Sequence, residues 1–277
     1  MTQFYTPTQL QRLTKECGLR PSKDFGQNYL LRPEPVEEML AVANVSKEDV
    51  VVEVGPGFGV LTLALADTAK QVVAFEIEKK MAGYWNKEKK QYPNIQIVWG
   101  DALKMLPAHV LPAGYKVVAN IPYQITSPLL RLFLEEMPVK PESLTLLVQK
   151  EVAERVVAGA GDASILSLSV QYYGDPEIVA EVPRHFFWPA PKVDSAILHI
   201  KLNPVSKKDA LEADTFFALV KAGFSNRRKL LIKNLENAPA YKAIDWGKVW
   251  QNKGWDRLRR AQELSLEEWK DLYQTIK

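Results

Sequence analysis

Short apolar runs alternate along the first two thirds of the chain with segments whose apolar residues recur at helical spacing. The spacing at Val36, Met39, Leu40 and Ala43 predicts a helix, and so does the segment around residues 61–65. The runs that we expect to be strands are 50–54, 72–75, 95–98, 117–119 and 144–148. Strands that alternate with helices indicate a largely parallel sheet covered on both faces. Later runs at 178–180 and 196–200 are expected to pair antiparallel at one edge.

The pattern changes near Pro204, beyond which only helix-like segments follow. We expect these helices at 216–222, 228–235 and 266–276, separated by polar stretches. The predicted organisation is therefore an α/β domain over residues 1–205 and a small all-helical domain over residues 206–277. The sequence contains no internal repeat and no low-complexity tract.

Composition changes this picture little. The 277 residues are 47% hydrophobic and 25% charged, with a net charge of +3, which is ordinary for a globular protein and allows a basic face. The single Cys17 fits a reducing compartment, and none of the three His has ligand spacing to another, so we expect no metal site. No stretch approaches the roughly 20 apolar residues of a membrane span, and no signal pattern opens the chain. These features predict a soluble, cytoplasmic protein.

Candidate binding residues stand where successive predicted strands end. Gly55 and Gly57 follow the first strand, Glu76 ends the second, Asp101 follows the third and Asn120 ends the fourth. Open α/β sheets bind ligands at this edge, glycines admit a ligand close to the backbone, and an acid after the second strand can accept from ribose hydroxyls. Each residue has a plainer interpretation, such as a solvated acid for Glu76 or a helix N-cap for Asp101. The spacing GPGFG also differs from the GxGxxG of dinucleotide-binding proteins.

Residues 120–123 read Asn-Ile-Pro-Tyr and close the fourth predicted strand. This tetrapeptide combines two carbonyl acceptors, at Asn120 and Ile121, with the ring of Tyr123 on a corner stiffened by Pro122. Such a corner suits a planar exocyclic amine that is hydrogen-bonded at its edge and stacked on its ring. The alternative is an ordinary turn, in which Asn and Pro are common.

Seven segments follow one another along the chain: FGQNYL at 25–30, VVEVGPGFGVLT at 51–62, FEIE at 75–78, GDAL at 100–103, ANIPYQITSPLL at 119–130, FFWPAPKVDSAIL at 186–198 and FSNRRKLLIKNL at 224–235. With these segments in this order, the chain resembles the KsgA-type small-subunit rRNA adenine dimethyltransferases, which use S-adenosylmethionine. The resemblance covers nearly the whole chain from about residue 20. It implies a class I (Rossmann-like) methyltransferase fold over 1–205 and a helical RNA-binding domain over 206–277.

The resemblance also implies roles for individual residues. Residues 1–30 would form a flexible arm and a lid over the cofactor. Cofactor contacts would come from Asn28, Leu30, Gly55, Gly57, Glu76, Asp101 and Asn120. Glu76 would hold the ribose and Asp101 the cofactor's adenine amine.

At the target, the Asn120 side-chain carbonyl and the Ile121 main-chain carbonyl would accept the two hydrogens of the adenine amine. These contacts would orient the nitrogen for in-line attack without a strong general base. Tyr123, on the corner that Pro122 stiffens, would stack on one face of the base, and Phe187 on the other. We expect core packing for Phe186 or Trp188, but not for Phe187.

Basic residues gather in the predicted helical domain. Arg227, Arg228 and Lys229, with Lys233 one turn on, are expected to begin a helix and to contact RNA phosphates. A second group is Arg257, Arg259 and Arg260. A solvated helix face is the plainer interpretation of either group. The expected partners are small-subunit rRNA and the assembling small subunit, with the protein acting as a monomer.

Three other functions compete with this one. A macrolide-resistance methyltransferase of large-subunit rRNA shares the cofactor motifs and NIPY, but PKVDSA, FSNRRK and the helical tail favour the small-subunit enzyme. A DNA adenine methyltransferase more often carries DPPY or NPPY. A non-catalytic assembly factor could dispense with Glu76, Asp101 and Asn120, yet all three are present. Gln124 and Trp188 depart from the family pattern on the target side.

Overall fold

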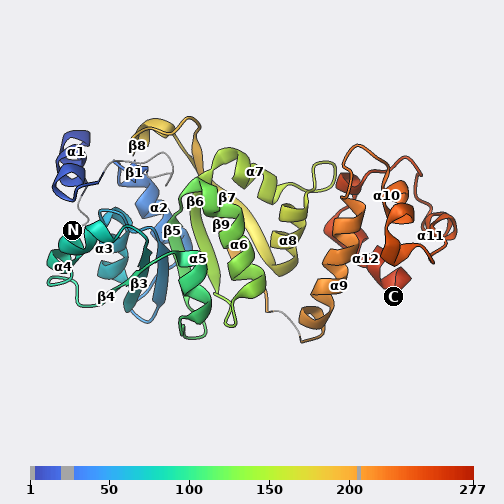
Figure 1. Ribbon diagram of the computed structural model, residues 1–277, viewed down its shortest axis with the longest axis horizontal. Coiled ribbons are helices and arrows are strands. Elements are labelled where there is room, and N and C mark those ends of the chain that lie inside the picture. Colours follow the sequence, from blue (N-terminus) through green and yellow to red (C-terminus); the bar gives the residue numbers. More distant parts are fainter. Residues whose placement is uncertain (1–3, 20–27, 205–206) are drawn as a thin grey trace. The chain divides into compact units, whose positions relative to one another are not determined.

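The computed structural model describes residues 4–19, 28–204 and 207–277, with the side chains of 207–211 left out. Its centre is a seven-stranded sheet with the order β4-β3-β2-β5-β6-β9-β7 (Figure 1). The strands are β2 (Val50–Val54), β3 (Gln71–Glu76), β4 (Ile95–Trp99), β5 (Lys116–Asn120), β6 (Ser143–Gln149), β7 (Gly174–Val182) and β9 (Ser195–Leu202). All seven were expected from the apolar runs.

Parallel pairing joins the first five of these strands, and β9 then pairs antiparallel with β6. Strands β2, β5 and β6 are almost entirely buried because helices cover both faces, which explains their continuous apolar runs. Helices α2 (Glu34–Ala43) and α3 (Val60–Thr68) pack on each other and on the sheet. Helices α5 (Ala102–Met105) and α6 (Thr126–Arg131) cross the other face (Figure 1). The fold class is confirmed as a Rossmann-like α/β fold.

The chain divides into two compact units. The first comprises residues 1–153 and 176–202, and the second comprises 154–175 and 203–277. The boundary near residue 205 thus has a counterpart, but residues 154–175 group with the C-terminal helices. No local pattern indicated this grouping, because α8 (Ile165–Tyr173) follows the α/β domain directly in the chain. In space it contacts α9 (Lys207–Gly223) and α12 (Leu266–Ile276).

The remaining helices of the second unit differ partly from expectation. Helix α10 spans Leu231–Asn237, so its first residue lies three positions beyond Arg228, where we expected the helix to start. Helix α11 (Trp246–Lys253) was not predicted from the sequence. Two tryptophans of this helix, Trp246 and Trp250, form its buried apolar face. None of the helices that the structure describes is long and apolar enough to cross a membrane.

Two further elements of the first unit lie near the pocket described below. Helix α1 (Pro7–Glu16) packs against the domain through its buried Leu10. Just before the helix, the Tyr5 hydroxyl lies 2.9 Å from the Tyr84 hydroxyl. The flexible arm and cofactor lid that we expected over residues 1–30 stay a prediction, and residues 20–27 lie outside the described residues. Strands β1 (Tyr29–Leu30) and β8 (Phe187–Trp188) pair antiparallel, a contact between distant segments that no local pattern indicated.

Candidate active site

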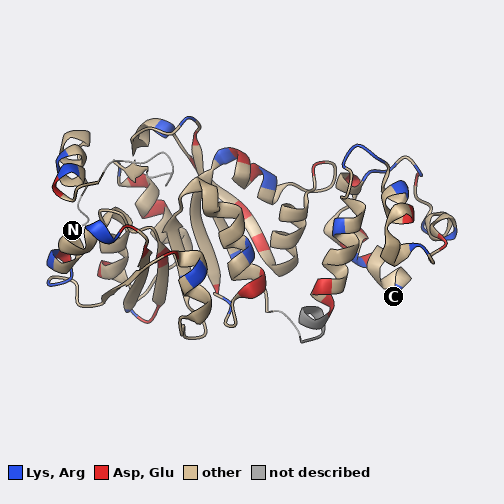
Figure 2. Ribbon diagram, viewed as in Figure 1, with Lys and Arg blue, Asp and Glu red and all other residues tan. Residues whose placement is uncertain are grey.

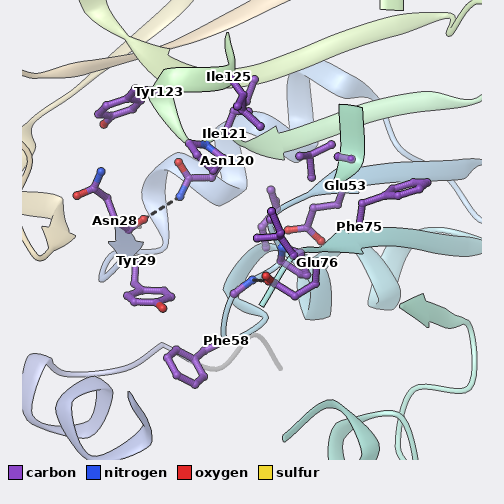
Figure 3. Close-up of a pocket in the computed structure, with 18 of the residues that line it drawn as sticks. Asn28, Tyr29, Glu53, Phe58, Phe75, Glu76, Asn120, Ile121, Tyr123 and Ile125 are labelled. Carbon is purple, nitrogen blue, oxygen red and sulfur yellow. Dashed lines mark hydrogen bonds between the residues drawn. The ribbon is translucent and has the colours of Figure 1, made fainter. Parts of the chain in front are cut away.

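A pocket opens at the carboxyl ends of β2, β3 and β5 (Figure 3). Asn28 and Tyr29 lie on one side of it, and Glu53 and Glu76 on the other (Figure 3). The sequence-predicted residues that line it are Asn28, Leu30, Gly55, Gly57, Glu76, Asp101, Asn120, Ile121, Pro122 and Tyr123. The structure thus brings together every candidate cofactor residue and all but one of the candidate catalytic residues.

The glycine turn after β2 needs glycine for two reasons. Gly55 and Gly57 have φ values of 75° and 54°, in a backbone region that residues other than glycine rarely adopt. A Cβ on Gly57 would also lie only 3.1 Å from the Tyr29 ring, whereas one on Gly55 would meet the Pro122 ring at 3.6 Å, an ordinary van der Waals distance. The turn is therefore a close-packed backbone surface against which a ligand can lie.

Glu76 is fixed by main-chain hydrogen bonds. Its two carboxylate oxygens accept from the N–H groups of Gly57, at 3.2 Å, and Glu78, at 2.8 Å. The side chain is buried, and this burial raises the pKa of Glu76 while the N–H donors act in the opposite direction. The carboxylate is held in one orientation, with acceptor capacity left for hydroxyl groups in the pocket.

Glu53 is a site residue to which our sequence analysis assigned no role. Its side chain is 1% exposed, and its Oε2 atom is buried without a hydrogen-bond partner among the described residues. Burial, together with the nearby Glu76 charge, raises the pKa of Glu53 to about 8. The available signal was a carboxylate inside the apolar run VVVEV, because an acid is rarely buried in a strand without a partner.

Asp101 caps a helix and also lines the pocket. Its Oδ1 atom accepts from the Leu103 N–H at 3.0 Å and so caps α5. The same residue lines the pocket, where its Oδ2 atom lies 3.8 Å from the Lys104 amine. One oxygen therefore holds the helix start, while the other can accept from a ligand.

Asn120 is oriented by the segment that carries Asn28. Its Nδ2 atom donates to the Asn28 main-chain carbonyl at 3.1 Å (Figure 3). Because a carbonyl only accepts, this bond fixes which end of the amide faces Asn28 and leaves the Asn120 Oδ1 atom as an acceptor. The next residue, Ile121, is held by its N–H, which donates to the Leu147 carbonyl at 3.3 Å. The NIPY corner is thus anchored at two successive residues.

Tyr123 lies at the same side of the pocket as Asn120 and Ile121 (Figure 3). Its hydroxyl is 2.7 Å from the Ser195 Oγ atom at the start of β9. This hydrogen bond fixes the ring, and burial raises the pKa of the phenol so that it stays protonated near neutral pH. Gln124 also lines the pocket.

The expected packing of residues 186–188 is reversed. Phe187 is 2% exposed and belongs to the hydrophobic core, where it pairs with Leu30 across β1 and β8, and it does not line the pocket. Phe186 and Trp188 are only partly buried, and Trp188 stacks on Tyr29. The physical reason is the strand register, which turns Phe187 and its neighbours to opposite faces. The Phe187 ring therefore packs in the core and not at the pocket, and its expected stacking on a base stays a prediction.

The basic residues lie in the second unit (Figure 2). Arg227, Arg228 and Lys229 occupy the turn before α10 rather than its first turn, because Asn226 accepts from the N–H groups of Arg228 and Lys229. The three side chains are exposed. Lys233 lies within α10 and pairs with Glu236 at 2.8 Å.

Of the second basic group, Arg259 serves the fold. Its guanidinium forms two bonds to the Glu268 carboxylate, at 2.8 and 2.9 Å. The neighbouring Arg257 and Arg260 are exposed and form no ion pair with the residues that the structure describes. Residues 203–277 carry 15 Lys and Arg against 10 Asp and Glu, so the net charge of this segment is +5 in a chain of net +3. The positive charge of the protein is therefore concentrated in its C-terminal segment.

A doubly wound sheet with a glycine turn, a main-chain-bound acid after β3 and an Asn-Ile-Pro-Tyr corner after β5 defines a Rossmann-like methyltransferase. Comparison with known proteins agrees. The family described as "Ribosomal RNA adenine dimethylase" matches residues 18–275, and the chain belongs to this family.

Relatives and solved structures support the same assignment. The chain is 40% identical, over 95% of its length and 91% of the relative's, to "Ribosomal RNA small subunit methyltransferase A" of Dehalococcoides mccartyi. It is 37% identical to the protein of that name from Clostridioides difficile, over 96% and 94% of the two chains. A dimethyladenosine transferase from Plasmodium falciparum superposes with a TM-score of 0.73 at 27% identity, covering 89% of this chain and 96% of that one. The 23S rRNA methyltransferase ErmE gives 0.72 at 26%, covering 90% and 99%.

Proposed function

We propose that the protein transfers methyl groups from S-adenosylmethionine to the exocyclic amine of adenines in a small-subunit rRNA loop, giving dimethyladenosine during ribosome assembly. The observation that carries this proposal is the NIPY corner. There the Asn120 amide is oriented by Asn28, so that its Oδ1 atom remains an acceptor beside the Ile121 carbonyl. Two fixed acceptors match the two hydrogens of an adenine amine.

The residues of the pocket fit S-adenosylmethionine. Glu76 would accept from the ribose hydroxyls, the Asp101 Oδ2 atom from the adenine amine, and the backbone at Gly55 would lie against the methionine part. The Glu76 carboxylate makes the pocket electronegative, which suits a cationic ligand, whereas Glu53, whose pKa is raised to about 8, is mostly protonated at neutral pH. When bound, this cofactor supplies an electrophilic methyl group on a positively charged sulfur.

The target nitrogen needs orientation more than deprotonation. Its lone pair is conjugated with the ring, so acceptors at Asn120 and Ile121 would turn it toward the methyl group and stabilise the positive charge that develops on the amine. Tyr123, fixed by Ser195, would stack on the base, which must leave its helix to enter the pocket. After one transfer the amine keeps a single hydrogen, so the second transfer would proceed with one of these two hydrogen bonds lost.

The second unit would supply RNA affinity. Arg227, Arg228 and Lys229 are exposed, close in sequence and without ion pairs to the described residues. Lysine and arginine on such a turn contact phosphates in a way that weakens steeply with salt. Lys233, which pairs with Glu236, would add less. The proposed enzyme acts as a monomer on the assembling small subunit.

The test offers unmodified small and large ribosomal subunits separately to the purified protein with labelled S-adenosylmethionine, followed by nucleoside analysis. The expected product is dimethyladenosine on the small subunit. The rate of methyl transfer should fall by a factor of about 10² to 10³ in Asn120→Ala. Asn237→Ala, an exposed amide at the end of α10, serves as the matched control and should retain full activity.

A large-subunit target is the second candidate, because ErmE superposes on this chain nearly as well as the dimethyladenosine transferase does. Label on the large subunit would move the assignment to that activity. Tight binding to small subunits without any label would instead support a non-catalytic assembly role.

A further inference from the structure

An apolar side chain stands in the middle of the second basic group. Leu258 is 68% exposed and lies between Arg257 and Arg259 in the segment after α11. Its N–H donates to the Asp256 Oδ1 atom at 2.8 Å, which closes a tight turn. A single exposed leucine is common on protein surfaces, so its exposure alone assigns no role.

Three contacts of Arg259 fix the turn that presents Leu258. The Arg259 guanidinium binds the Glu268 carboxylate and lies 4.8 Å from the centre of the Trp255 ring. The Arg259 main-chain carbonyl accepts from the Leu231 N–H at 2.9 Å. A leucine held outward by a fixed turn has already lost backbone freedom, so binding a partner costs it little further entropy.

The bond between Leu231 and Arg259 also joins the two basic groups. Leu231 begins α10, directly after the turn that carries Arg227, Arg228 and Lys229. The two turns, whose Lys and Arg are coloured blue in Figure 2, are therefore neighbours within one unit. Besides those three residues, Arg257 and Arg260 also lack ion pairs with the described acids.

We propose that Leu258 is an RNA-contacting residue that packs on a base or ribose face while the surrounding cations hold the phosphates. The inference rests on the proposed function in one respect, the identity of the partner as small-subunit rRNA. RNA is the occupant that the charges favour, because exposed bases and sugars offer apolar faces bordered by phosphates. A protein partner of the same shape would have to be strongly acidic around an apolar centre.

The experiment measures equilibrium binding of the full-length protein to protein-free small-subunit rRNA over a series of salt concentrations. Leu258→Ala is expected to weaken binding about fivefold, the loss for about half the burial of a leucine side chain, with an unchanged salt slope. Arg257→Ala should instead reduce the salt slope by about 0.7 to 0.9. Leu258→Met should bind nearly as tightly as the wild type, since it keeps an apolar side chain of similar size.

Val110→Ala is the matched control. Val110 is 94% exposed and lies in the first unit, in the loop before β5, so the substitution removes an exposed aliphatic side chain without touching a basic surface. Its RNA affinity should equal that of the wild type. The melting temperature of each variant is measured alongside, and Leu258→Ala should leave it unchanged because the side chain is exposed.

Two results would overturn the inference. The first is equal rRNA affinity for Leu258→Ala and Val110→Ala. The second is a loss that appears only with intact subunits and never with protein-free rRNA, which would make Leu258 a protein contact. Failure of the proposed function is separate, because binding is measured without methyl transfer: an active site that does not methylate small subunits leaves the affinity comparison intact.

Discussion

The pocket of the first unit and the basic turns of the second are built in opposite ways. In the pocket, two important polar groups are oriented by the main chain: Glu76 by two N–H groups, and Asn120 by the Asn28 carbonyl. In the turns before α10 and after α11, Arg227, Arg228, Lys229, Arg257 and Arg260 are exposed and form no ion pair with the described acids, whereas Arg259 is bound by Glu268. The difference separates chemistry, which needs fixed geometry, from affinity for a polyanion, which needs accessible positive charge.

The largest expected effect tests how far burial controls the pocket. Because the pKa of Glu53 is raised to about 8, the folded protein binds a proton that the unfolded chain releases above its ordinary pKa. The free energy of unfolding should therefore fall as pH rises from about 5 to 8, by up to about 4 kcal/mol. Glu53→Gln, which cannot ionise, should show a flatter curve over that range, measured by chemical denaturation. Identical pH dependence in both proteins would contradict a protonated Glu53.

The next effect concerns the charge that the backbone holds in place. Glu76→Gln replaces a charged carboxylate with a neutral amide, which has one accepting oxygen instead of two. The affinity for S-adenosylmethionine should therefore fall about 10- to 100-fold. Isothermal calorimetry measures this directly. Glu78→Gln, two residues further along the chain and outside the pocket lining, is the control and should change affinity less than about threefold. Equal losses in both variants would mean that general charge, rather than orientation, holds the cofactor.

A smaller effect separates backbone strain from ligand contact. Gly55 and Gly114 have φ values of 75° and 78°, yet only Gly55 lines the pocket, while a Cβ at Gly114 would meet open space. Each Gly→Ala substitution should cost about 1 to 2 kcal/mol of stability, measured by thermal unfolding. Cofactor affinity should fall about tenfold in Gly55→Ala alone. A parallel loss in Gly114→Ala would attribute the effect to stability and not to close approach.

The smallest effect concerns the contribution of individual cations of the second unit to RNA binding. Arg227→Ala and Arg228→Ala should each reduce the salt slope of rRNA binding by about 0.7 to 0.9. Lys233→Ala should change it less, because that amine is paired with Glu236. The measurement is a filter-binding titration at several salt concentrations. If Lys233→Ala gave the larger change, ion pairing would be a poor guide to which cations meet phosphate.

How much could be predicted from the sequence follows the same division. The strands and the site residues at their ends were predictable, because buried parallel strands leave continuous apolar runs and Glu76, Asp101 and Asn120 follow those runs directly. The start of α10 was misplaced because the boundary depends on Asn226 accepting main-chain N–H groups, which polar sequence does not reveal.

Two features of the pocket region were missed for another reason: the burial of Phe187 in the core and the unpartnered carboxylate of Glu53. Whether Phe187 faces the pocket depends on its pairing with Leu30, a residue far away in the chain, and local sequence cannot give that register. Glu53 carried a signal, an acid inside an apolar strand, but its lack of a partner becomes visible only when its surroundings are known. The grouping of residues 154–175 with the C-terminal helices is likewise a property of packing alone.

The pairing of β1 with β8 has a consequence for synthesis. Strand β6 receives its neighbour β9 only when residues 195–202 are made, and the segment carrying Asn28 and Leu30 meets its partner strand only after residue 188. Contacts of such sequence separation form late, since a long loop must close first. A nascent chain that stops at residue 150 holds the glycine turn, Glu76, Asp101 and the NIPY corner, yet lacks the strands that complete their surroundings. The ability to bind cofactor and target should therefore arise in one step, late in translation.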